Sequence, residues 1–192
     1  MSGAADILPA RAEALRLIKD HGYVRRDEPF RLASGQLSHD YIDVKRAIDT
    51  GSRLRVVSTA IIDLAQQQSM RFTHVGGRTM GADPLAHGIA LLADTGWFSV
   101  RKEPKPRGLE QWIEGSELGH GHRVLLVEDV VTTGGSVVMA YEHVVETGAD
   151  VIGVIPLVDR GETARHVFEE LGVPYAPLVT YKDIGIDPVG PG

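Results

Sequence analysis

The chain has 192 residues, of which 43% are hydrophobic and 24% charged, a composition typical of a soluble globular domain rather than a disordered tail, a collagen or a coiled coil. The formal net charge of −6 argues against a nucleic-acid surface, which normally carries a basic excess. Because the sequence has no membrane-length apolar run, no recognisable signal peptide and no cysteine, we expect a cytoplasmic protein with no membrane partner.

Helical and strand-like segments alternate along most of the sequence. Apolar residues at helical spacing predict helices, and short continuous apolar runs predict buried strands. In chain order we expect helix 9–20, a hairpin over 29–44 around Ser34-Gly35, helix 52–68, strand 72–75, helix 83–92, strand 97–100, strand 124–127, helix 136–147, strand 151–158, helix 163–171 and strand 175–180. This order predicts an α/β fold with a mainly parallel central sheet flanked by helices.

Residues 101–122 lack any periodicity, and a connection of this length inside a compact domain is usually a functional loop. The first eight residues of this segment carry a local charge of +3, which predicts an anionic ligand. A solvated, charged strand end is the alternative for the first two of its cations. The four cations are Arg101, Lys102, Lys105 and Arg107.

The most informative segment is VLLVEDVVTTGGS, residues 124–136. It reads as an apolar strand that runs into Glu128 and Asp129, then a Thr/Gly turn and the start of a helix. Backbone N–H groups and hydroxyls at such a turn bind phosphate, whereas a carboxylate pair accepts hydrogen bonds from a diol. A phosphate beside a diol describes a ribose 5-phosphate. The alternative is a plain turn with Ser136 as N-cap after a solvated acid pair.

Residues 124–136 resemble the 5-phosphoribosyl 1-pyrophosphate (PRPP) motif of type I phosphoribosyltransferases. Three further segments narrow the resemblance to orotate phosphoribosyltransferases: FRLASG at 30–35 leading to YID at 41–43, RKEPK at 101–105, and Asp159-Arg160. The resemblance implies a single type I phosphoribosyltransferase domain over residues 1–192. Within it, about residues 1–50 would form a small hood and residues 101–122 a flexible lid loop.

This resemblance implies transfer of the 5-phosphoribosyl group from PRPP to orotate, giving orotidine 5′-monophosphate and pyrophosphate in UMP biosynthesis. Mg²⁺ is the implied cofactor, held mainly through PRPP, with Asp129 as the candidate protein ligand. The implied assembly is a homodimer in which the lid serves the neighbouring subunit. Two alternatives stay open: a transferase for another base, and a PRPP-binding regulator with the same fold.

The same likeness assigns site residues. Lys105 and Asp129 are the expected catalytic residues. The residues expected to bind orotate are Tyr41, Ile42, Thr132 and Arg160. The planar guanidinium of Arg160 suits the carboxylate of orotate. An ion pair of Arg160 with Asp159 or Glu162 is the alternative. The expected PRPP-binding residues are Arg101, Lys102, Lys105, Arg107, Glu128, Asp129, Val130, Val131, Thr132, Thr133, Gly134, Gly135 and Ser136.

Three positions depart from the family pattern. Ala33 stands where many members carry a lysine, and Thr79-Met80 where many carry Tyr-Lys in the pyrophosphate loop. Arg107 replaces the usual lid histidine, so this position keeps its charge but does not titrate near neutral pH. These changes bear on how the chain holds pyrophosphate.

Overall fold

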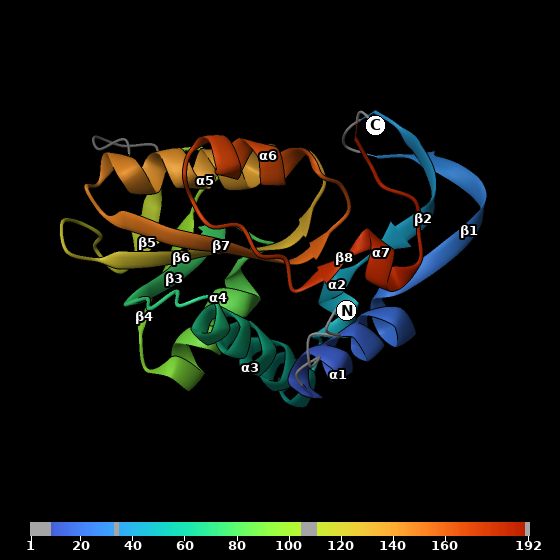
Figure 1. The fold of residues 1–192 in the computed structure, drawn as a ribbon, viewed down its shortest axis with the longest axis horizontal. Helices are drawn as coiled ribbons and strands as arrows, with labels where there is room; N and C mark the ends of the chain where they lie inside the picture. Colours follow the sequence, from blue (N-terminus) through green and yellow to red (C-terminus); the bar gives the residue numbers. More distant parts are fainter. Residues whose placement is uncertain (1–8, 33–34, 105–110, 191–192) are drawn as a thin grey trace, which may run out of the picture.

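The computed structural model describes residues 9–32, 35–104 and 111–190. At its centre is a six-stranded sheet of strand order β5-β4-β3-β6-β7-β8 (Figure 1). Every pairing in this sheet is parallel except that of β4 with β5, so the mainly parallel α/β architecture is confirmed. The strands are β3 His74–Arg78, β4 Gly96–Val100, β5 Ile113–Gly115, β6 Arg123–Val131, β7 Asp150–Asp159 and β8 Val179–Thr180.

Helices cover both faces of the sheet (Figure 1). One face carries α1 Pro9–Leu17, α3 Gly51–Gln67 and α4 Asp83–Ala93, and the other carries α5 Gly135–Glu146 and α6 Thr163–Glu170. Successive side chains of a strand point to opposite faces, so a central strand supplies both layers. In β6, Leu125 and Val127 enter one hydrophobic cluster while Val124 and Leu126 enter the other. This double burial explains why β6 is apolar without a break.

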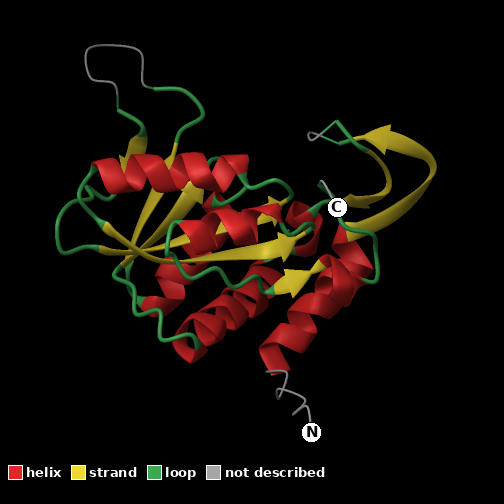
Figure 2. Cartoon of the chain, turned by 45° about the horizontal axis from the view of Figure 1, so that its top comes forward, coloured by secondary structure: helices red, strands yellow, loops and turns green. Residues whose placement is uncertain are grey.

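Strands of the N-terminal region form a second, two-stranded sheet. After α1 comes a π-helix, Ile18–Gly22, and then the antiparallel pair β1 Tyr23–Arg31 and β2 Leu37–Ile42, followed by the short helix α2 Val44–Ala47. Figure 2 shows this hairpin curving away from the sheet. It stands where the expected hood would cover the carboxyl ends of β6 and β7.

Several expected boundaries were wrong. The first helix ends at Leu17 rather than residue 20, because the chain continues as a π-helix. β1 begins at Tyr23, earlier than the expected hairpin, because most of its residues are exposed and carry no buried alternation to reveal a strand. β6 continues to Val131, so the acid pair lies inside the strand rather than beyond it. The expected strand 175–180 is reduced to β8 and an isolated bridge at Tyr175.

Two further elements were missed because they are short. Strand β5 lies inside the segment 101–122 that we expected to be structureless, where it pairs with the edge strand β4. Helix α7, Tyr181–Ile184, begins with a capping box between Thr180 and Asp183. None of the helices in the described part of the chain is both long and apolar enough to cross a membrane.

Candidate functional site

The acid pair of β6 forms the floor of the site. Glu128 is only 4% exposed, and its Oε1 accepts a hydrogen bond from the backbone N–H of Asp129 at 3.2 Å. Burial, reinforced by the neighbouring Asp129 charge, raises the pKa of Glu128 to about 8. A Cβ added at Gly81 would lie 2.7 Å from Glu128 Oε1, so this glycine packs directly against the pair. A solvated acid pair was therefore the wrong alternative for Glu128.

Asp129 is the more accessible acid, with its side chain 17% exposed. Its Oδ1 accepts the backbone N–H of Val130 at 2.8 Å. Its Oδ2 accepts a hydrogen bond from Lys45 Nζ at 2.9 Å, an ion pair that the sequence did not predict. Asp129 therefore faces the cavity with one oxygen on its own strand and the other on a cation from the N-terminal region.

The turn after β6 leads into α5 without a side-chain cap. Gly134 occupies the N-cap position with a φ of 89°, and a Cβ there would meet that of Ala164 at 2.8 Å, so the position requires glycine. Ser136 lies inside the first turn of α5, which excludes it as the N-cap. The N–H groups of this first turn have no side-chain cap, and together with the helix dipole they favour an anion.

A cavity of about 400 Å³ opens over the acid pair and the start of α5. It brings together Glu128, Asp129, Val130, Ser136 and Lys102 of the predicted set, whereas Val131 is buried beneath the site. Sequence reasoning missed two of its cations, Lys45 and Arg78. Arg78 ends β3, the strand beside β6, and donates a hydrogen bond to Ser136 Oγ at 3.1 Å. The full lining is Lys45, Arg78, Thr79, Met80, Gly81, Lys102, Glu128, Asp129, Val130 and Ser136.

Arg160, directly after β7, is 2% exposed. Its Nη2 donates to Ser38 Oγ at 3.4 Å, and its buried Nε has no hydrogen-bond partner among the described residues. Burial lowers the pKa of Arg160, while the charge of Asp40 opposes that shift. The backbone N–H of Arg160 donates to the carbonyl of Val131 at 2.8 Å, which places Arg160 beside the turn that begins at Thr132.

Asp159 and Glu162, the two carboxylates considered as ion-pair partners of Arg160, bind other groups instead. Asp159 accepts hydrogen bonds from the Gly161 N–H at 3.0 Å and from the Tyr175 hydroxyl at 2.9 Å. Glu162 accepts from Tyr181 and Lys182, both at 2.9 Å. Both carboxylates are therefore held by other groups, and the guanidinium of Arg160 remains largely unpaired.

Strand β2 presents different residues to its two faces. Asp40 is 5% exposed and accepts hydrogen bonds from the Tyr23 hydroxyl at 2.8 Å and Arg25 Nη1 at 3.0 Å. Ser38 shares the face of Asp40, because side chains two residues apart in a strand point the same way. The ring of Tyr41 lies on the opposite face, edge-on to Phe30 at 5.5 Å between centroids. The face toward Arg160 is therefore that of Ser38 and Asp40. The sequence placed Asp40 near the base pocket, as a surface turn residue rather than a catalyst, and did not single out Ser38.

The remaining predicted residues divide into four groups. Ile42 is buried in a hydrophobic cluster rather than in the cavity. Arg101 pairs with Glu114 at 3.2 Å, while Lys102 lines the cavity. Thr132 is half-buried, Thr133 exposed, and Gly135 begins α5. Lys105, Arg107 and the departure at Ala33 lie outside the described residues.

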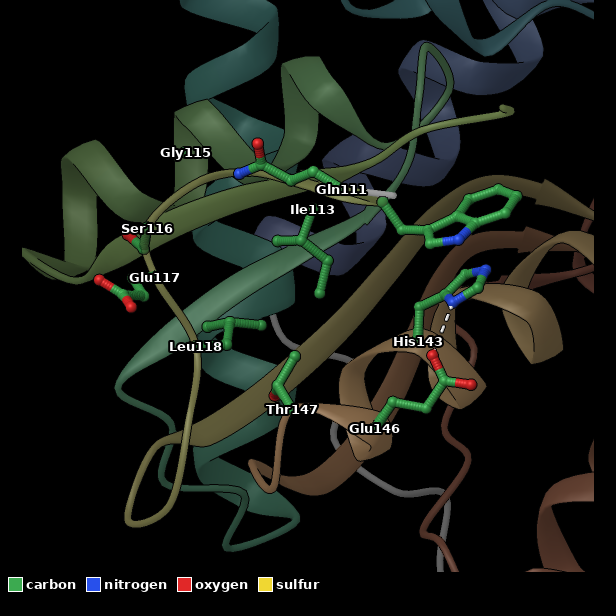
Figure 3. A pocket seen from close by; sticks show the side chains of 10 residues that line it. Gln111, Ile113, Gly115, Ser116, Glu117, Leu118, His143, Glu146 and Thr147 are labelled. Atoms are coloured by element: carbon green, nitrogen blue, oxygen red, sulfur yellow. Dashed lines mark hydrogen bonds and ion pairs between the residues drawn. The ribbon is translucent and has the colours of Figure 1, made fainter. Parts of the chain in front are cut away.

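A second cavity, of about 520 Å³, lies at the other end of α5 (Figure 3). Its lining includes Trp112, which stacks on His143 with ring centroids 4.1 Å apart, and His143 Nδ1 lies 3.0 Å from Glu146 Oε2. This cavity includes neither the acid pair nor Arg160. The smaller cavity is the better candidate because it combines fixed cations, a carboxylate pair and a helix N-terminus.

Comparisons with known proteins agree with this choice. A family model described as phosphoribosyl transferase domain matches residues 48–171. The chain is 38% identical to an orotate phosphoribosyltransferase of Pyrococcus furiosus over 174 residues. The matched region covers 91% of this chain and 94% of that protein. It also resembles the solved orotate phosphoribosyltransferase of Mycobacterium tuberculosis H37Rv, with a TM-score of 0.78 and 33% identity over 93% of this chain and 100% of that one. The Mycobacterium enzyme has also been solved in complex with PRPP, and that structure matches with a TM-score of 0.74 and 33% identity over 93% and 100% of the two chains.

Proposed function

This chain belongs to the orotate phosphoribosyltransferase family, and we propose that it binds PRPP at the end of β6 and orotate at the end of β7. It transfers the 5-phosphoribosyl group from PRPP to orotate, forming orotidine 5′-monophosphate and pyrophosphate in pyrimidine biosynthesis. The observation that carries the choice of base is the buried Arg160, whose Nε has no hydrogen-bond partner within the part of the chain that the structure describes. A buried, unpaired guanidinium is costly unless an anionic ligand completes it.

The PRPP assignment follows the chemistry of each part of the site. The 5′-phosphate takes the turn at 132–136, where the first N–H groups of α5 have no side-chain cap. The ribose hydroxyls donate to Asp129 and Glu128. Arg78 and Lys102 are cations of the cavity lining, which suits the pyrophosphate. Arg101, Lys105 and Arg107 remain further predicted PRPP contacts.

The reaction needs little covalent help from the protein. Nitrogen N1 of orotate attacks C1 of the ribose while the bond from C1 to the pyrophosphate oxygen breaks. Positive charge develops on the sugar and negative charge on the leaving group. Fixed cations near the leaving group stabilise its negative charge. The carboxylate of Asp129, beside the ribose, stabilises the positive charge that develops on the sugar. The proton on N1 is lost as the new bond forms, and the departing pyrophosphate or water accepts it, so the protein need not supply a strong base.

A magnesium ion fits this site as a companion of PRPP. No group of three or more histidine, aspartate or glutamate side chains that could hold a metal occurs within 9–32, 35–104 and 111–190. Glu128, with a pKa of about 8, carries a proton at neutral pH, which leaves Asp129 as the accessible carboxylate. Mg²⁺ commonly binds through one or two carboxylates together with substrate phosphates. Asp129 would hold it, and the ion would neutralise charge on pyrophosphate.

Orotate would lie between the end of β7 and the hood. Arg160 would bind its carboxylate, and Thr132, on the neighbouring turn, would contact the ring. Tyr41 and Ile42 remain predictions for this pocket, since the side chains that face Arg160 come from Ser38 and Asp40. A transferase for another base gains no support from the described residues, because a buried arginine favours an acidic base.

We further propose a cytoplasmic homodimer whose lid, residues 101–122, carries Lys105 over the partner's site. Lys105→Ala and Asp129→Ala homodimers should each be nearly inactive. Subunit exchange should restore roughly a quarter of the sites, because half of the dimers are mixed and each mixed dimer has one intact pocket under one intact lid. No recovery in confirmed mixed dimers would contradict lid sharing.

The test of the activity is direct. Purified protein with PRPP, Mg²⁺ and orotate should consume orotate, followed by its loss of absorbance, and release pyrophosphate in equal amount. Uracil, which lacks the carboxylate, is the matched control and should react far more slowly. Turnover of uracil or of a purine base at a rate equal to that of orotate would overturn the choice of base.

A further inference from the structure

Lys45 enters the cavity from a part of the chain that carries no predicted site residue for PRPP. It lies in α2, just after the hairpin, and is 84 residues from Asp129 in sequence. Its Nζ is 2.9 Å from Asp129 Oδ2, and its side chain is 52% exposed. This contact places the ammonium of Lys45 at the edge of the cavity, next to the carboxylate of Asp129.

The charges around Lys45 favour an anion in the cavity. Lys45, Arg78 and Lys102 supply three positive charges to its lining. Glu128 and Asp129 are the two acids of the lining, so its cations outnumber its carboxylates. This excess of positive charge favours a polyanionic ligand.

The other lining residues give Lys45 a specific place in that balance. Met80, in the loop after β3, lines the same cavity and offers no charge to a ligand. Arg78 ends β3 and Lys102 follows β4, while Lys45 reaches the cavity from α2 in the N-terminal region. A lysine has a flexible stem and three donors, so it can leave one acceptor for a stronger one without a backbone change.

We propose that Lys45 is a further catalytic residue that contacts the pyrophosphate of PRPP, with Asp129 holding its ammonium ready in the free enzyme. The proposal rests on the function proposed above. When the ribose hydroxyls donate to Asp129, they compete with the ammonium for the carboxylate. The entering pyrophosphate then offers Lys45 a more highly charged partner. The hood thereby supplies a cation to the leaving group that the loop at 79–80 does not supply.

A mere surface ion pair is the competing explanation. Exposed pairs contribute little to stability, and a lysine that serves only this pair would not distinguish between ligands. The matched control is Arg46, the next residue of α2. Arg46 is 71% exposed, pairs with Asp43 at 3.5 Å and does not line the cavity. Arg46→Met removes a neighbouring charge of the same sign from the same helix.

The experiment compares two probes by calorimetry: magnesium pyrophosphate, and ribose 5-phosphate, which has the diol and phosphate but no pyrophosphate. Lys45→Met should weaken magnesium pyrophosphate binding by roughly tenfold or more, as expected for a lost charged hydrogen bond. Binding of ribose 5-phosphate should stay unchanged or tighten, because Asp129 is freed. Lys45→Arg should recover part of the pyrophosphate affinity, and Arg46→Met should match the wild type.

The outcomes separate this inference from the proposed function. If the wild type does not convert orotate, the function fails and the inference falls with it. If the wild type is active and Lys45→Met binds magnesium pyrophosphate as the wild type does, only the inference is overturned. Equally weakened binding of both probes would also overturn the inference, since Lys45 would then act only by positioning the carboxylate of Asp129. Lys45→Gln, checked for folding by thermal melting, repeats the comparison if the Met variant does not fold.

Discussion

Strands β6 and β7 are parallel neighbours, and each has two adjacent charged residues in or at its carboxyl-terminal end, yet the two pairs are held differently. At the end of β7, the buried Asp159 is satisfied within the protein by a backbone N–H and by Tyr175. Its neighbour Arg160 is buried with an unpartnered Nε. On β6, Glu128 is buried beside another acid, and Asp129 is held by a half-exposed lysine.

The difference shows that burial alone does not separate a structural charge from a binding one. Asp159 and Arg160 are both 2% exposed, but only the first has its partners in the fold. Removing a charge that has partners within the protein should lower the free energy of unfolding. Removing a charge that has no such partner, or an exchangeable one such as Lys45, should weaken ligand binding. Each of the following predictions tests one of the four residues against that rule.

The largest effect is expected at Asp129. Asp129→Asn removes the charge that accepts hydrogen bonds from the ribose, and charged hydrogen bonds contribute about 1.5–3 kcal/mol each. Two such bonds predict a fall in kcat/KM of roughly 100-fold or more, with a change in the free energy of unfolding of less than about 1 kcal/mol. Steady-state kinetics and urea unfolding measure the two quantities. Asp150→Asn, at the exposed start of β7, is the control and should change neither.

Arg160 should show a selective effect on one substrate. Arg160→Ala removes the charged partner of the orotate carboxylate, at a cost of about 1.5–3 kcal/mol, and so should raise the KM for orotate by roughly 10- to 100-fold. The KM for PRPP should change much less. Equal increases in both constants would assign Arg160 to the general architecture of the site instead. Thermal melting of the variant shows whether it remains folded.

Asp159 should behave in the opposite way. Asp159→Asn keeps the shape but weakens the hydrogen bonds from Gly161 and Tyr175, so we expect a loss of about 1–3 kcal/mol in the free energy of unfolding. The KM for orotate in the folded variant should stay within about twofold of the wild type. Tyr175→Phe removes one of the same bonds and should destabilise the protein less. A selective orotate defect without destabilisation would break the comparison between Asp159 and Arg160.

The sequence predicted those parts of the site that are continuous in the chain. Residues 124–136 form one strand, turn and helix, so local pattern was enough to place the acid pair and the turn. Lys45 and Ser38 reach the site through contacts with Asp129 and Arg160 that span 84 and 122 residues. Their positions depend on how β2 and α2 contact the ends of β7 and β6, and no local pattern encodes those contacts.

Burial of individual charges was also beyond the sequence. Alternation suggests that Glu128 and Asp129 point to opposite sides of β6, but it does not say which side is closed. Gly81, which has no side chain, packs against the acid pair. It belongs to a loop more than 40 residues before Glu128 in the sequence. Strand β5 escaped notice for a different reason, since three residues are too few to show a period.

The last prediction concerns Glu128, whose effect on stability is gradual because it accumulates over several pH units. Its pKa is raised from 4.5 to about 8 in the folded protein, so the folded state holds this proton more tightly than the unfolded state. This contribution to stability is fully present below pH 4.5 and is lost as the pH rises toward 8. Glu128→Gln keeps the acceptor for the Asp129 N–H and cannot ionise.

The variant should therefore gain stability relative to the wild type across that range, by up to about 1.4 kcal/mol for each pH unit, and the difference should level off above pH 8. Urea unfolding of both proteins at several values between pH 5 and pH 9 measures this difference, and shared effects of pH cancel in it. A constant difference would mean that Glu128 ionises alike in the folded and unfolded states. A difference that shrinks as the pH rises would mean that the folded protein holds Glu128 as a stabilised carboxylate.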